Sequence, residues 1–598
     1  MIKIEELSAY PASPYDYIDT GEKLKTAIQT AATTNKFGIN IETTGPDPHR
    51  DRIRLIQIAV PNQSVLVIDL FQIPQAEWNP LKSLLQGNAL KIGHTLKTER
   101  KFLVAAQLGF KGPYFDTEIA YRLILAGRNR KTTLQTIVAI FLRFQFSQEQ
   151  ASGNFHGLLS QNQMQHAANK ADASLKLEPH LEERLNQNNS RQWNIAHNIE
   201  FPCIAVTASL ELSGIQFDLK SWLKAAQQFD ETRTQAWKLV KQLRRSNINQ
   251  MSLLPEFTDT VNPNSHTQLL AALQDLGIPI TTTSGKSLAP FAQDYPVVQA
   301  VLEHQQLSKL NPFGESYPTY IHPKTGRIHA DWLQIGTKTG RLTCKNPPLQ
   351  TIPRDRCLRE CFVARSGYKI IKADYSQIEL RILARICQDQ PLISAFQKGQ
   401  DVHALTAAVV FHKSSSQISA EERRIGKIIN FGIIYRMSSK RLKQTLEDKA
   451  HYFISQRDAE QFINDFYEKH PAIKQWQTTI CHPLRRKTRY IGQTLAGRLR
   501  YWEWEDKPPV TEIINYPVQG LNADIYKEAA HQFLSQQADQ NLTAEFILMI
   551  HDELVLECPA DQANIICKIL HACMLKAAKQ WLEPIPVVID IQIGNSWK

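Results

Sequence analysis

The segment from Glu421 to Met437 carries the pattern that most constrains the fold of this chain. Its cationic and aromatic side chains recur every four residues, at Arg423, Lys427, Phe431 and Tyr435. Because an α-helix advances 3.6 residues per turn, residues four apart drift by only about 40° per step and share one stripe. Isoleucines cover much of the remaining surface, so the segment predicts an amphipathic helix.

The order of the side chains along this stripe also indicates a ligand. Two cations at one end suit a triphosphate, and two flat rings further along suit a base and a sugar. The competing interpretation is a core helix with a solvated basic end, which describes most segments of this kind. Two buried carboxylates elsewhere in the chain would favour the nucleotide.

Two aspartates end or interrupt runs that are typical of buried β-strands. Tyr368–Asp374 is a short β-rich run, and a helical pattern follows it over Tyr375–Arg385. Glu545–Cys558 contains two apolar runs joined at Asp552, which predicts a hairpin with carboxylates at its tip. A carboxylate among apolar side chains is costly unless a cation pairs with it. Two such aspartates, with a cationic and aromatic helix between them in sequence, favour a two-metal site for phosphoryl transfer.

Length and composition describe an ordinary soluble protein of several domains. The 598 residues suffice for three or four units with cores of their own. The net charge of +11 is a mild bias that fits a polyanionic partner. The sequence has no apolar run long enough to cross a bilayer, no secretory signal at its start, and nine cysteines without zinc-binding spacing. We therefore expect no membrane partner, and free thiols in the cytoplasm.

Residues 1–190 predict an α/β domain. Three strand patterns precede two helical patterns, at Phe37–Thr44, Arg52–Val60, Ser64–Leu70, Thr98–Ala106 and Glu118–Ala126. The region resembles the proofreading 3′–5′ exonuclease domain of family A DNA polymerases, a ribonuclease-H-like fold, through the segments INIETTG, IGHTLKTERKFL, FDTEIAYRL and HAANKADASLKL. In that family four carboxylates hold two metal ions, and a tyrosine or histidine positions the attacking water.

This chain departs from the exonuclease pattern at several of its functional positions. The matching residues are Asn40, Glu42, Glu99, His166 and Lys170. Asn40, Glu99 and Lys170 replace aspartates of the family, and a lysine in a two-metal cage repels the ions. Asp172 lies two residues beyond Lys170 but faces a different side of a helix. We expect a platform that no longer cuts; the alternative is slow one-metal cutting through Glu42 and Glu99, with His166 as the base.

Long helical patterns occupy about residues 200–330. They cover Ile199–Gly214, Leu219–Arg245, Asn262–Leu276 and Tyr295–Leu310. Their order resembles the thumb of family A polymerases, through IEFPCIAV, GIQFD, NPNSHTQLL and LSKL. A thumb grips duplex DNA through its phosphates and does not select a sequence.

The rest of the chain closely resembles the catalytic core of family A DNA polymerases. DYSQIELR is similar to motif A, RRIGKIINFGIIY to motif B and IHDELVLE to motif C. Flanking segments agree, namely TKTGRLTCKNPPLQTIP, NYPVQGLNADIYKEA and IGNSWK. The resemblance covers nearly the whole chain and implies an α/β multidomain protein, whose ribonuclease-H-like exonuclease-type domain precedes a right-hand polymerase domain. That domain would span 195–598, with the thumb at about 200–330, the palm at about 331–400 and 500–598, and the fingers at about 401–499.

The resemblance implies two-metal nucleotidyl transfer to a primer 3′-hydroxyl. Asp374 and Asp552 match the carboxylates that hold two magnesium ions, Mg2+, in the family. One ion would lower the pKa of the primer hydroxyl, and the other would neutralise the triphosphate and the departing pyrophosphate. Glu553 matches an accessory acid. Lys427 matches a phosphate ligand and is the candidate acid that protonates pyrophosphate.

Other positions match residues that contact the nucleotide and the DNA. Arg423 would bind the triphosphate beside Lys427, and Phe431 would lie against the incoming sugar and base. Tyr435 would guard the insertion site and stack near the template base. Glu379 resembles the steric gate that crowds a ribose 2′-hydroxyl. The residues that resemble minor-groove and primer-end contacts are Arg341, Asn515, Gln519 and His551.

We therefore expect a DNA-templated DNA polymerase, a nucleotidyltransferase of replication or repair. Its partners would be primer–template DNA and deoxynucleoside triphosphates, and it would act as a monomer. Because the resemblance begins almost at Met1, we expect no 5′-nuclease domain ahead of it. The alternatives are a polymerase with weak 3′–5′ exonuclease activity, a nuclease, a single-subunit RNA polymerase and a non-catalytic DNA-binding relic. Lys170 speaks against the nuclease, and Glu379 speaks against the RNA polymerase.

Overall fold

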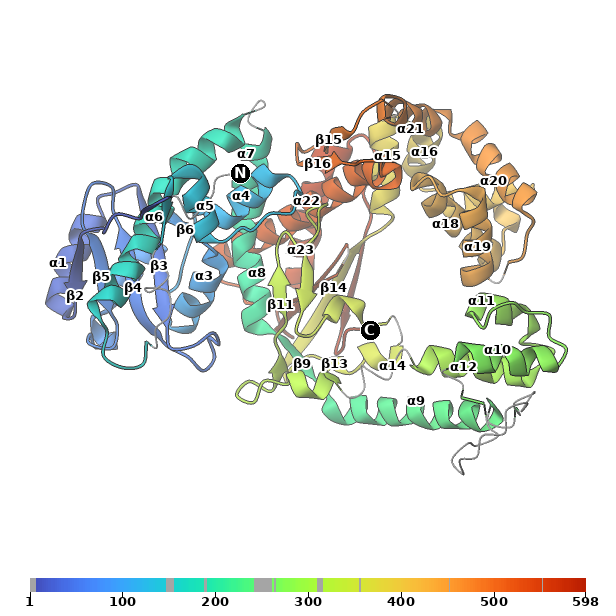
Figure 1. Ribbon diagram of the computed structural model, residues 1–598, viewed down its shortest axis with the longest axis horizontal. Helices are drawn as coiled ribbons and strands as arrows, with labels where there is room; N and C mark the ends of the chain where they lie inside the picture. The colour runs from blue at the N-terminus through green and yellow to red at the C-terminus, as the bar shows by residue number, and fades with distance from the viewer. Residues whose placement is uncertain are drawn as a thin grey trace.

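The computed structural model describes residues 7–146, 155–187, 191–240, 243, 261–262, 265–308, 316–353, 356–450, 452–484, 486–550 and 552–598. Figure 1 shows an α/β domain at one end of the molecule, joined to a larger body from which two groups of helices project. The α/β domain and the sheet of the larger body share one continuous hydrophobic core. Within the described residues, no helix combines the length and the apolar character that a membrane span requires.

A six-stranded sheet with the order β2-β5-β4-β3-β6-β7 is the centre of the N-terminal domain. β4 and β5 are buried at every position, as their continuous apolar runs predict. Helix α6 crosses this sheet closely, because a Cβ on Gly38 of β3 would lie 2.4 Å from the carbonyl oxygen of Ala171. The strands are β2 Tyr15–Ile18, β3 Lys36–Thr43, β4 Ile53–Ala59, β5 Val65–Asp69, β6 Leu90–Gly93 and β7 Tyr114–Asp116. The helices are α1 Gly21–Ala31, α2 Asn79–Gln86, α3 Leu96–Ala105, α4 Thr117–Leu125, α5 Leu134–Phe141 and α6 Gln161–Asn186.

A four-stranded antiparallel sheet with the order β17-β18-β14-β19 is the centre of the larger body. The predicted hairpin is confirmed, since Ile550 at the end of β17 lies opposite Glu553 at the start of β18. Helices α15, α22 and α23 contact one another beside this sheet. The elements are β14 Tyr368–Tyr375, β17 Glu545–Ile550, β18 Glu553–Pro559, β19 Ile589–Gly594, α8 Phe201–Ser213, α15 Ile378–Cys387, α22 Val510–Asp539 and α23 Ala563–Leu582.

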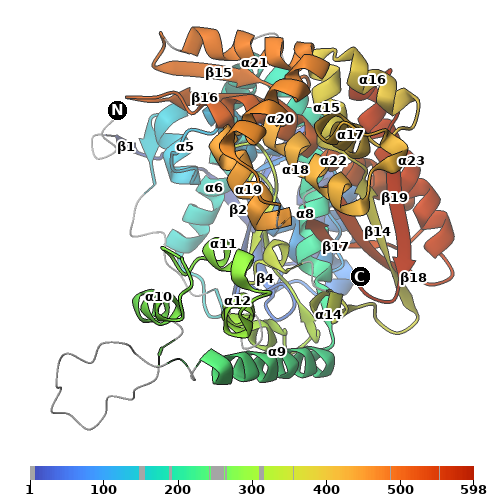
Figure 2. The same ribbon diagram turned by 90° about the vertical axis from the view of Figure 1, so that its right-hand side faces the viewer.

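Two groups of helices face each other in Figure 1, on the side of this sheet away from the N-terminal domain. The α9–α12 group has an apolar cluster of its own and comprises α9 Leu219–Val240, α10 His266–Asp275, α11 Gly285–Leu288 and α12 Pro296–Ser308. The α16–α21 group comprises α16 Gln390–Gln397, α17 Val402–Phe411, α18 Ala420–Ile434, α19 Ser439–Ala450, α20 Gln456–Lys469 and α21 Pro471–Leu484. Helix α11 of the first group contacts α19 of the second. Figure 2 shows the α9–α12 group below the α16–α21 group.

Short elements connect these parts. They are β1 Ser8–Ala9, β8 Phe144–Gln145, α7 Arg191–Ile195, β9 Ile215–Phe217, β10 Arg327–Ile328, β11 Asp331–Leu333, β12 Thr343–Lys345, α14 Arg356–Arg359, β13 Phe362–Val363, β15 Arg489–Gln493 and β16 Leu499–Glu503. A buried network of charges joins three of the connected segments. Glu200 and Asp524 both accept from Arg498, and Glu200 also accepts from Lys527 at 2.7 Å. Opposite charges that satisfy one another in this way fix the segments against sliding.

Candidate active site

The register of the central sheet brings the two predicted aspartates together. Asp374 lies near the end of β14, opposite Glu553 of β18 and Asp590 of β19. Asp552 occupies the turn between β17 and β18, and its carbonyl oxygen accepts from the backbone N–H of Tyr375 at 3.4 Å. The two carboxylates therefore come from adjacent strands at one end of the sheet.

The electrostatics of this pair fit a divalent cation. Burial is the largest of the causes that together raise the pKa of Asp552 to about 7, followed by the negative charges of Asp374 and Glu379. Carboxylates that repel each other in a poorly solvated site are stabilised as anions by a bound cation. Within the described residues, no group of three or more His, Cys, Asp or Glu side chains is placed to hold a metal. Two carboxylates suit magnesium, which takes its remaining ligands from water and substrate phosphates.

Glu553 is tied to the C-terminal end of the chain. Its Oε1 accepts from the indole N–H of Trp597 at 2.7 Å, and its backbone carbonyl accepts from the Tyr526 hydroxyl at 2.9 Å. Trp597 is fully buried. Glu553 therefore lies opposite Asp374 in the sheet, and one of its two carboxylate oxygens accepts the hydrogen bond from Trp597.

The predicted stripe lies on α18, whose start is fixed by a capping box. The Ser419 hydroxyl accepts from the N–H of Glu422, and the Glu422 carboxylate accepts from the N–H of Ser419. The four side chains of the stripe stand on the solvent side: Arg423 and Lys427 are exposed, and Phe431 and Tyr435 are half-buried. The helix ends at Ile434, so Tyr435 is its C-cap rather than part of its last turn.

The opposite face of α18 contacts α17 at close range. A Cβ on Gly426 would lie 2.2 Å from the carbonyl oxygen of His403, so only glycine permits this approach. Asn430 is buried at the same contact, where its Oδ1 accepts from Thr406 at 2.9 Å and its Nδ2 lies 3.0 Å from His403 Nδ1. These contacts set the position of the stripe relative to α17.

Two residues of α17 that the sequence did not single out complete the cationic end of the stripe. Asp401 caps α17 by accepting from the N–H groups of His403 and Ala404, and it also pairs with Arg423. The His403 ring lies 5.9 Å from that of Phe431. The pKa of His403 is lowered to about 4, mainly by burial and also by the charges of Arg423 and Lys427, against the opposing charge of Asp401, so the imidazole is neutral. The signal was the Asp-x-His order directly before an apolar run.

Glu379 lies at the meeting point of three segments. Its carboxylate accepts from the guanidinium of Arg341 and from the hydroxyl of Tyr435. Burial and the charge of Glu379 raise the pKa of Tyr435, and a hydrogen bond with Gln519 of α22 opposes this rise. The structure thus brings the predicted gate, one end of the stripe and two predicted DNA contacts into one cluster.

Asn515 lies one helical turn before Gln519 on α22. Its Oδ1 is buried, and within the described part of the chain it has no hydrogen-bond partner. A buried acceptor without a partner carries a desolvation penalty that a ligand can remove. His551, which the sequence placed with these residues, lies outside the described residues.

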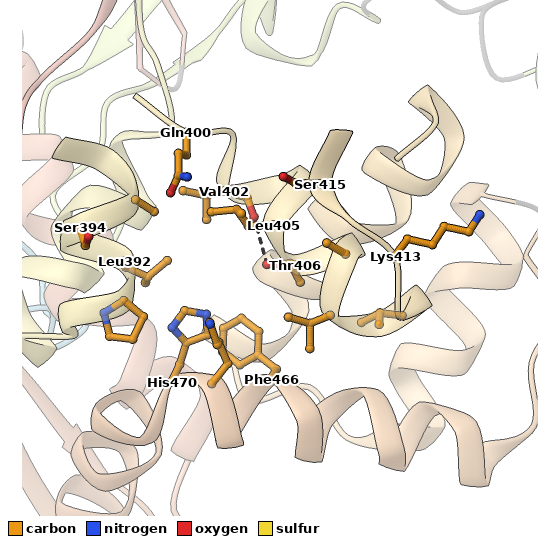
Figure 3. Close-up of a pocket in the computed structure, with 16 residues that line it drawn as sticks. Leu392, Ser394, Gln400, Val402, Leu405, Thr406, Lys413, Ser415, Phe466 and His470 are labelled. Carbon is orange, nitrogen blue, oxygen red and sulfur yellow. Dashed lines mark hydrogen bonds between the residues drawn. The ribbon is translucent and has the colours of Figure 1, made fainter. Parts of the chain in front are cut away.

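A cavity of about 440 Å³ inside the α16–α21 group is separate from this site. It is lined from α16, α17 and α20, and Figure 3 shows Leu392, Phe466 and His470 around it, with Lys413 at its edge. Residues of the stripe and the two aspartates do not line it. The largely apolar cavity therefore lies behind α17 and is not the predicted nucleotide site.

The N-terminal domain brings its five predicted positions together without forming a metal cage. Lys170 of α6 donates to Oε1 of Glu42 at 2.8 Å. Asn40 donates to the same oxygen at 3.2 Å and to Gln57 on β4 at 2.6 Å. Burial raises the pKa of Glu99 well above its usual value. The site therefore holds an internal ion pair, beside a carboxyl whose charged form is disfavoured by burial.

The remaining positions of this domain are consistent with that balance. Burial lowers the pKa of His166, and the charge of Lys170 lowers it further. Asp172 faces away, as predicted, and accepts from Tyr10 at 2.9 Å, Ser13 at 2.7 Å and Lys176 at 2.7 Å. Three donors hold Asp172 on that side of α6, so it does not replace the missing aspartate.

Comparisons with known proteins give concordant matches. Residues 229–598 match the profile of the family described as DNA polymerase family A, and residues 15–186 match a 3′–5′ exonuclease profile. The chain is 30% identical to DNA polymerase I of Aquifex aeolicus (strain VF5), over 98% of this chain and 99% of that one. It is 34% identical to DNA polymerase I of Treponema pallidum (strain Nichols), over 73% of this chain and 43% of that protein. The chain thus spans nearly all of one relative and less than half of the other.

A solved structure has the same fold as this chain. It is the POL domain of Pol1 from M. smegmatis, in complex with a DNA primer-template and dNTP. The TM-score is 0.81 at 23% sequence identity, and the match covers 97% of this chain and 99% of that one. The predicted arrangement, an exonuclease-type α/β domain followed by a polymerase-type domain, is confirmed.

Proposed function

The chain belongs to DNA polymerase family A, and we propose that it is a DNA-directed DNA polymerase that extends a primer 3′-hydroxyl. The observation that carries the proposal is the pair Asp374 and Asp552, which the sheet register joins at one end of β14. Glu379 lies beside this pair and is held by Arg341 and Tyr435. Two neighbouring, half-buried carboxylates in a chain that also has an exposed cationic helix suit phosphoryl transfer.

Asp374 and Asp552 are the residues that would hold Mg2+. Bound magnesium would supply charge neutralisation at the triphosphate and a lowered pKa of the primer hydroxyl. The raised pKa of Asp552 supports this assignment, because a group poised near neutral pH gives up its proton readily to a cation. Glu553, held by Trp597, keeps β18 in register with Asp374.

The stripe on α18 would bind the incoming nucleotide. Arg423 and Lys427 are exposed cations at the end of the stripe that suits a triphosphate. Lys427 would give its proton to the departing pyrophosphate. Phe431 would lie against the sugar and base, with neutral His403 behind it. Tyr435, just beyond the helix end, would close the insertion site on the template side.

Glu379 would exclude a ribose. Its carboxylate is fixed from two sides, by Arg341 and by Tyr435, so it cannot turn aside for a 2′-hydroxyl. A rigid group discriminates by steric exclusion more strongly than a mobile one. Asn515 offers a buried acceptor for a donor on a base edge, and Gln519 would contact the primer end beside it.

We propose that the N-terminal domain has lost 3′–5′ proofreading. The ion pair with Lys170 supports this proposal, because it uses a carboxylate oxygen of Glu42 that a metal ion would need. Burial disfavours the charged form of Glu99, whose pKa is raised, and Asp172 is held on another face of α6.

The assignment of regions follows the elements. The α9–α12 group would be the thumb, the α16–α21 group the fingers, and the β17-β18-β14-β19 sheet the palm, behind an exonuclease-like domain of about residues 1–190. The protein would act as a monomer on primer–template DNA with deoxynucleoside triphosphates. Its nine cysteines are free thiols, which suits the cytoplasm.

A templated-extension assay tests the proposal. Four primer–templates that differ at the first templating base are offered each deoxynucleotide and each ribonucleotide with magnesium. We expect extension only by the complementary deoxynucleotide. Equal use of all four deoxynucleotides, or a preference for ribonucleotides, would reject a DNA-templated DNA polymerase.

A further inference from the structure

A pocket of about 300 Å³ lies where the N-terminal domain meets the polymerase body. The turn after α4 forms one wall, and the loop from Ile335 to Gly340 forms the other. Arg498 and Leu499, at the start of β16, close the pocket. Figure 1 shows the end of α4 beside the β15–β16 hairpin, so the pocket spans two separate parts of the chain.

The lining of this pocket carries uncompensated positive charge. Arg122, Arg128 and Arg130 come from the N-terminal domain, and Lys338 comes from the polymerase body. Arg122 is neutralised by Glu118 at 2.7 Å. For Arg128, Arg130 and Lys338, no carboxylate in the described ranges of the chain lies within ion-pairing distance. Three unpaired cations around one small concave site favour an anion.

The loop that carries two of these cations is fixed to the polymerase body. The N–H of Tyr501 in β16 donates to the carbonyl oxygen of Ala126 at 2.8 Å. Arg128 Nε donates to the carbonyl oxygen of Leu125 at 2.9 Å, and its guanidinium lies 5.1 Å from the centre of the Tyr501 ring. Gly127, with a φ of 82°, makes the turn, and a Cβ at this position would lie 3.5 Å from the Lys338 side chain. The Arg128 guanidinium and the backbone of this loop are thus held in place before any ligand arrives.

The floor of the pocket contributes shape rather than charge. Arg498 is buried, and its guanidinium donates to the carboxylates of Asp524, at 2.6 Å, and of Glu200. Its charge is therefore balanced within the protein. A Cβ on Gly340 would lie 2.9 Å from the Arg498 guanidinium, which explains the close approach of the Ile335–Gly340 loop. The pocket therefore has a floor whose charges are balanced, and the unpaired cations lie around its opening.

The position of the pocket identifies its ligand. Lys338 lies three residues before Arg341, which is bound to Glu379 in the proposed polymerase site. The loop between them is closed, because Gly336 and Thr337 both donate to the carbonyl oxygen of Arg341. The pocket and Arg341 therefore share one loop, and DNA held at Arg341 would carry a backbone phosphate at every nucleotide.

We propose that this pocket binds a backbone phosphate of the DNA held by the polymerase domain, which makes the N-terminal domain part of the DNA grip. The proposal rests on the proposed function for the identity of the ligand. Arginine and lysine side chains bind phosphate oxygens irrespective of the base, so the contact adds affinity and no sequence preference. A domain that has lost its nuclease chemistry would keep a use in holding DNA.

The test measures DNA binding as a function of salt. Fluorescence anisotropy with a labelled primer–template gives the dissociation constant of the parent and of Arg130→Ala/Lys338→Ala between about 50 and about 200 mM salt. The slope of log affinity against log salt should become shallower by about 1 to 2 in the double variant, with binding about tenfold weaker at the higher salt. The single variant Lys338→Ala, at an exposed side chain, should give about half of the slope change. Primer extension at limiting DNA should fall by the same factor as binding.

A matched control removes the same charge elsewhere in the N-terminal domain. Lys25→Ala/Lys82→Ala takes two exposed lysines from α1 and α2 and should leave the slope, the affinity and the extension rate unchanged. A pocket variant with the parental slope would overturn the proposal. Calorimetry with inorganic phosphate is the second test. If the parent bound phosphate and the variant did not, but the salt slope for DNA was the same in both, the proposal would also be overturned. The salt slope comes from DNA binding and not from primer extension. If the parent bound DNA but did not extend a primer, the proposed function would be rejected, and the salt slope would still test whether the pocket binds DNA.

Discussion

The ion pair of Lys170 and Glu42 predicts that the protein does not shorten DNA from the 3′ end. A metal ion on Glu42 would lie on the order of 2 Å from the carboxylate, and Lys170 Nζ already stands 2.8 Å from Oε1. At about 4 Å and an effective dielectric constant of about 20, two unit charges repel by about 4 kcal/mol, so a divalent ion meets about 8 kcal/mol. Lys170 is 29% exposed. Halving the repulsion for solvent screening leaves about 4 kcal/mol, a loss of about a thousandfold in ion affinity.

The assay is digestion of end-labelled single-stranded DNA with magnesium or manganese. The parent and Glu42→Ala should show the same background. Asn40→Asp/Lys170→Asp, which restores two carboxylates around Glu42, should gain 3′ shortening. Lys176→Asp is the control, because it makes the same lysine-to-aspartate change on the face of α6 that holds Asp172. Clear shortening by the parent that disappears in Glu42→Ala would refute the charge argument.

Three further predictions concern the polymerase site. Glu379→Ala should admit ribonucleotides about tenfold more readily, measured as the ratio of kcat/KM for the two sugars; an unchanged ratio would move the gate elsewhere. Gly426→Ala should raise the KM for deoxynucleotides, since its Cβ would lie 2.2 Å from His403, whereas Gly432→Ala, with 3.4 Å to its nearest neighbour, should not. Because the pKa of Asp552 is raised to about 7, its proton competes with magnesium below that pH, so the half-saturating magnesium concentration should rise as pH falls from about 8 to about 6. A requirement that is the same at both pH values would contradict this.

The sequence predicted the elements whose periodicity is strong. The stripe on α18 and the hairpin around Asp552 follow from the periods of a helix and of paired strands, which depend only on local geometry. The one error at the stripe was its end, because Tyr435 is the C-cap that follows Ile434. Helix ends depend on what the last turn contacts, so spacing alone does not fix them.

Contacts between distant segments could not be predicted in the same way. The pairing of Lys170 with Glu42 joins α6 to β3, and a charge count indicated repulsion of metals but not this bond. The bond of Glu379 to Tyr435 joins α15 to the end of α18. His403 reaches Phe431 only because α17 and α18 touch at Gly426. Such pairs depend on tertiary packing, which has no period in the sequence.

The central claim is that Asp374 and Asp552 form the site of nucleotide addition. The most direct measurement is single-turnover extension by Asp552→Asn on prebound primer–template with saturating deoxynucleotide and magnesium. The account predicts that the rate falls by about a thousandfold or more, while the dissociation constant for DNA stays within about twofold. Asp590→Asn, an exposed carboxylate opposite Asp374 in the same sheet, should keep the parental rate. Extension by Asp552→Asn at more than a few per cent of the parental rate would contradict the account.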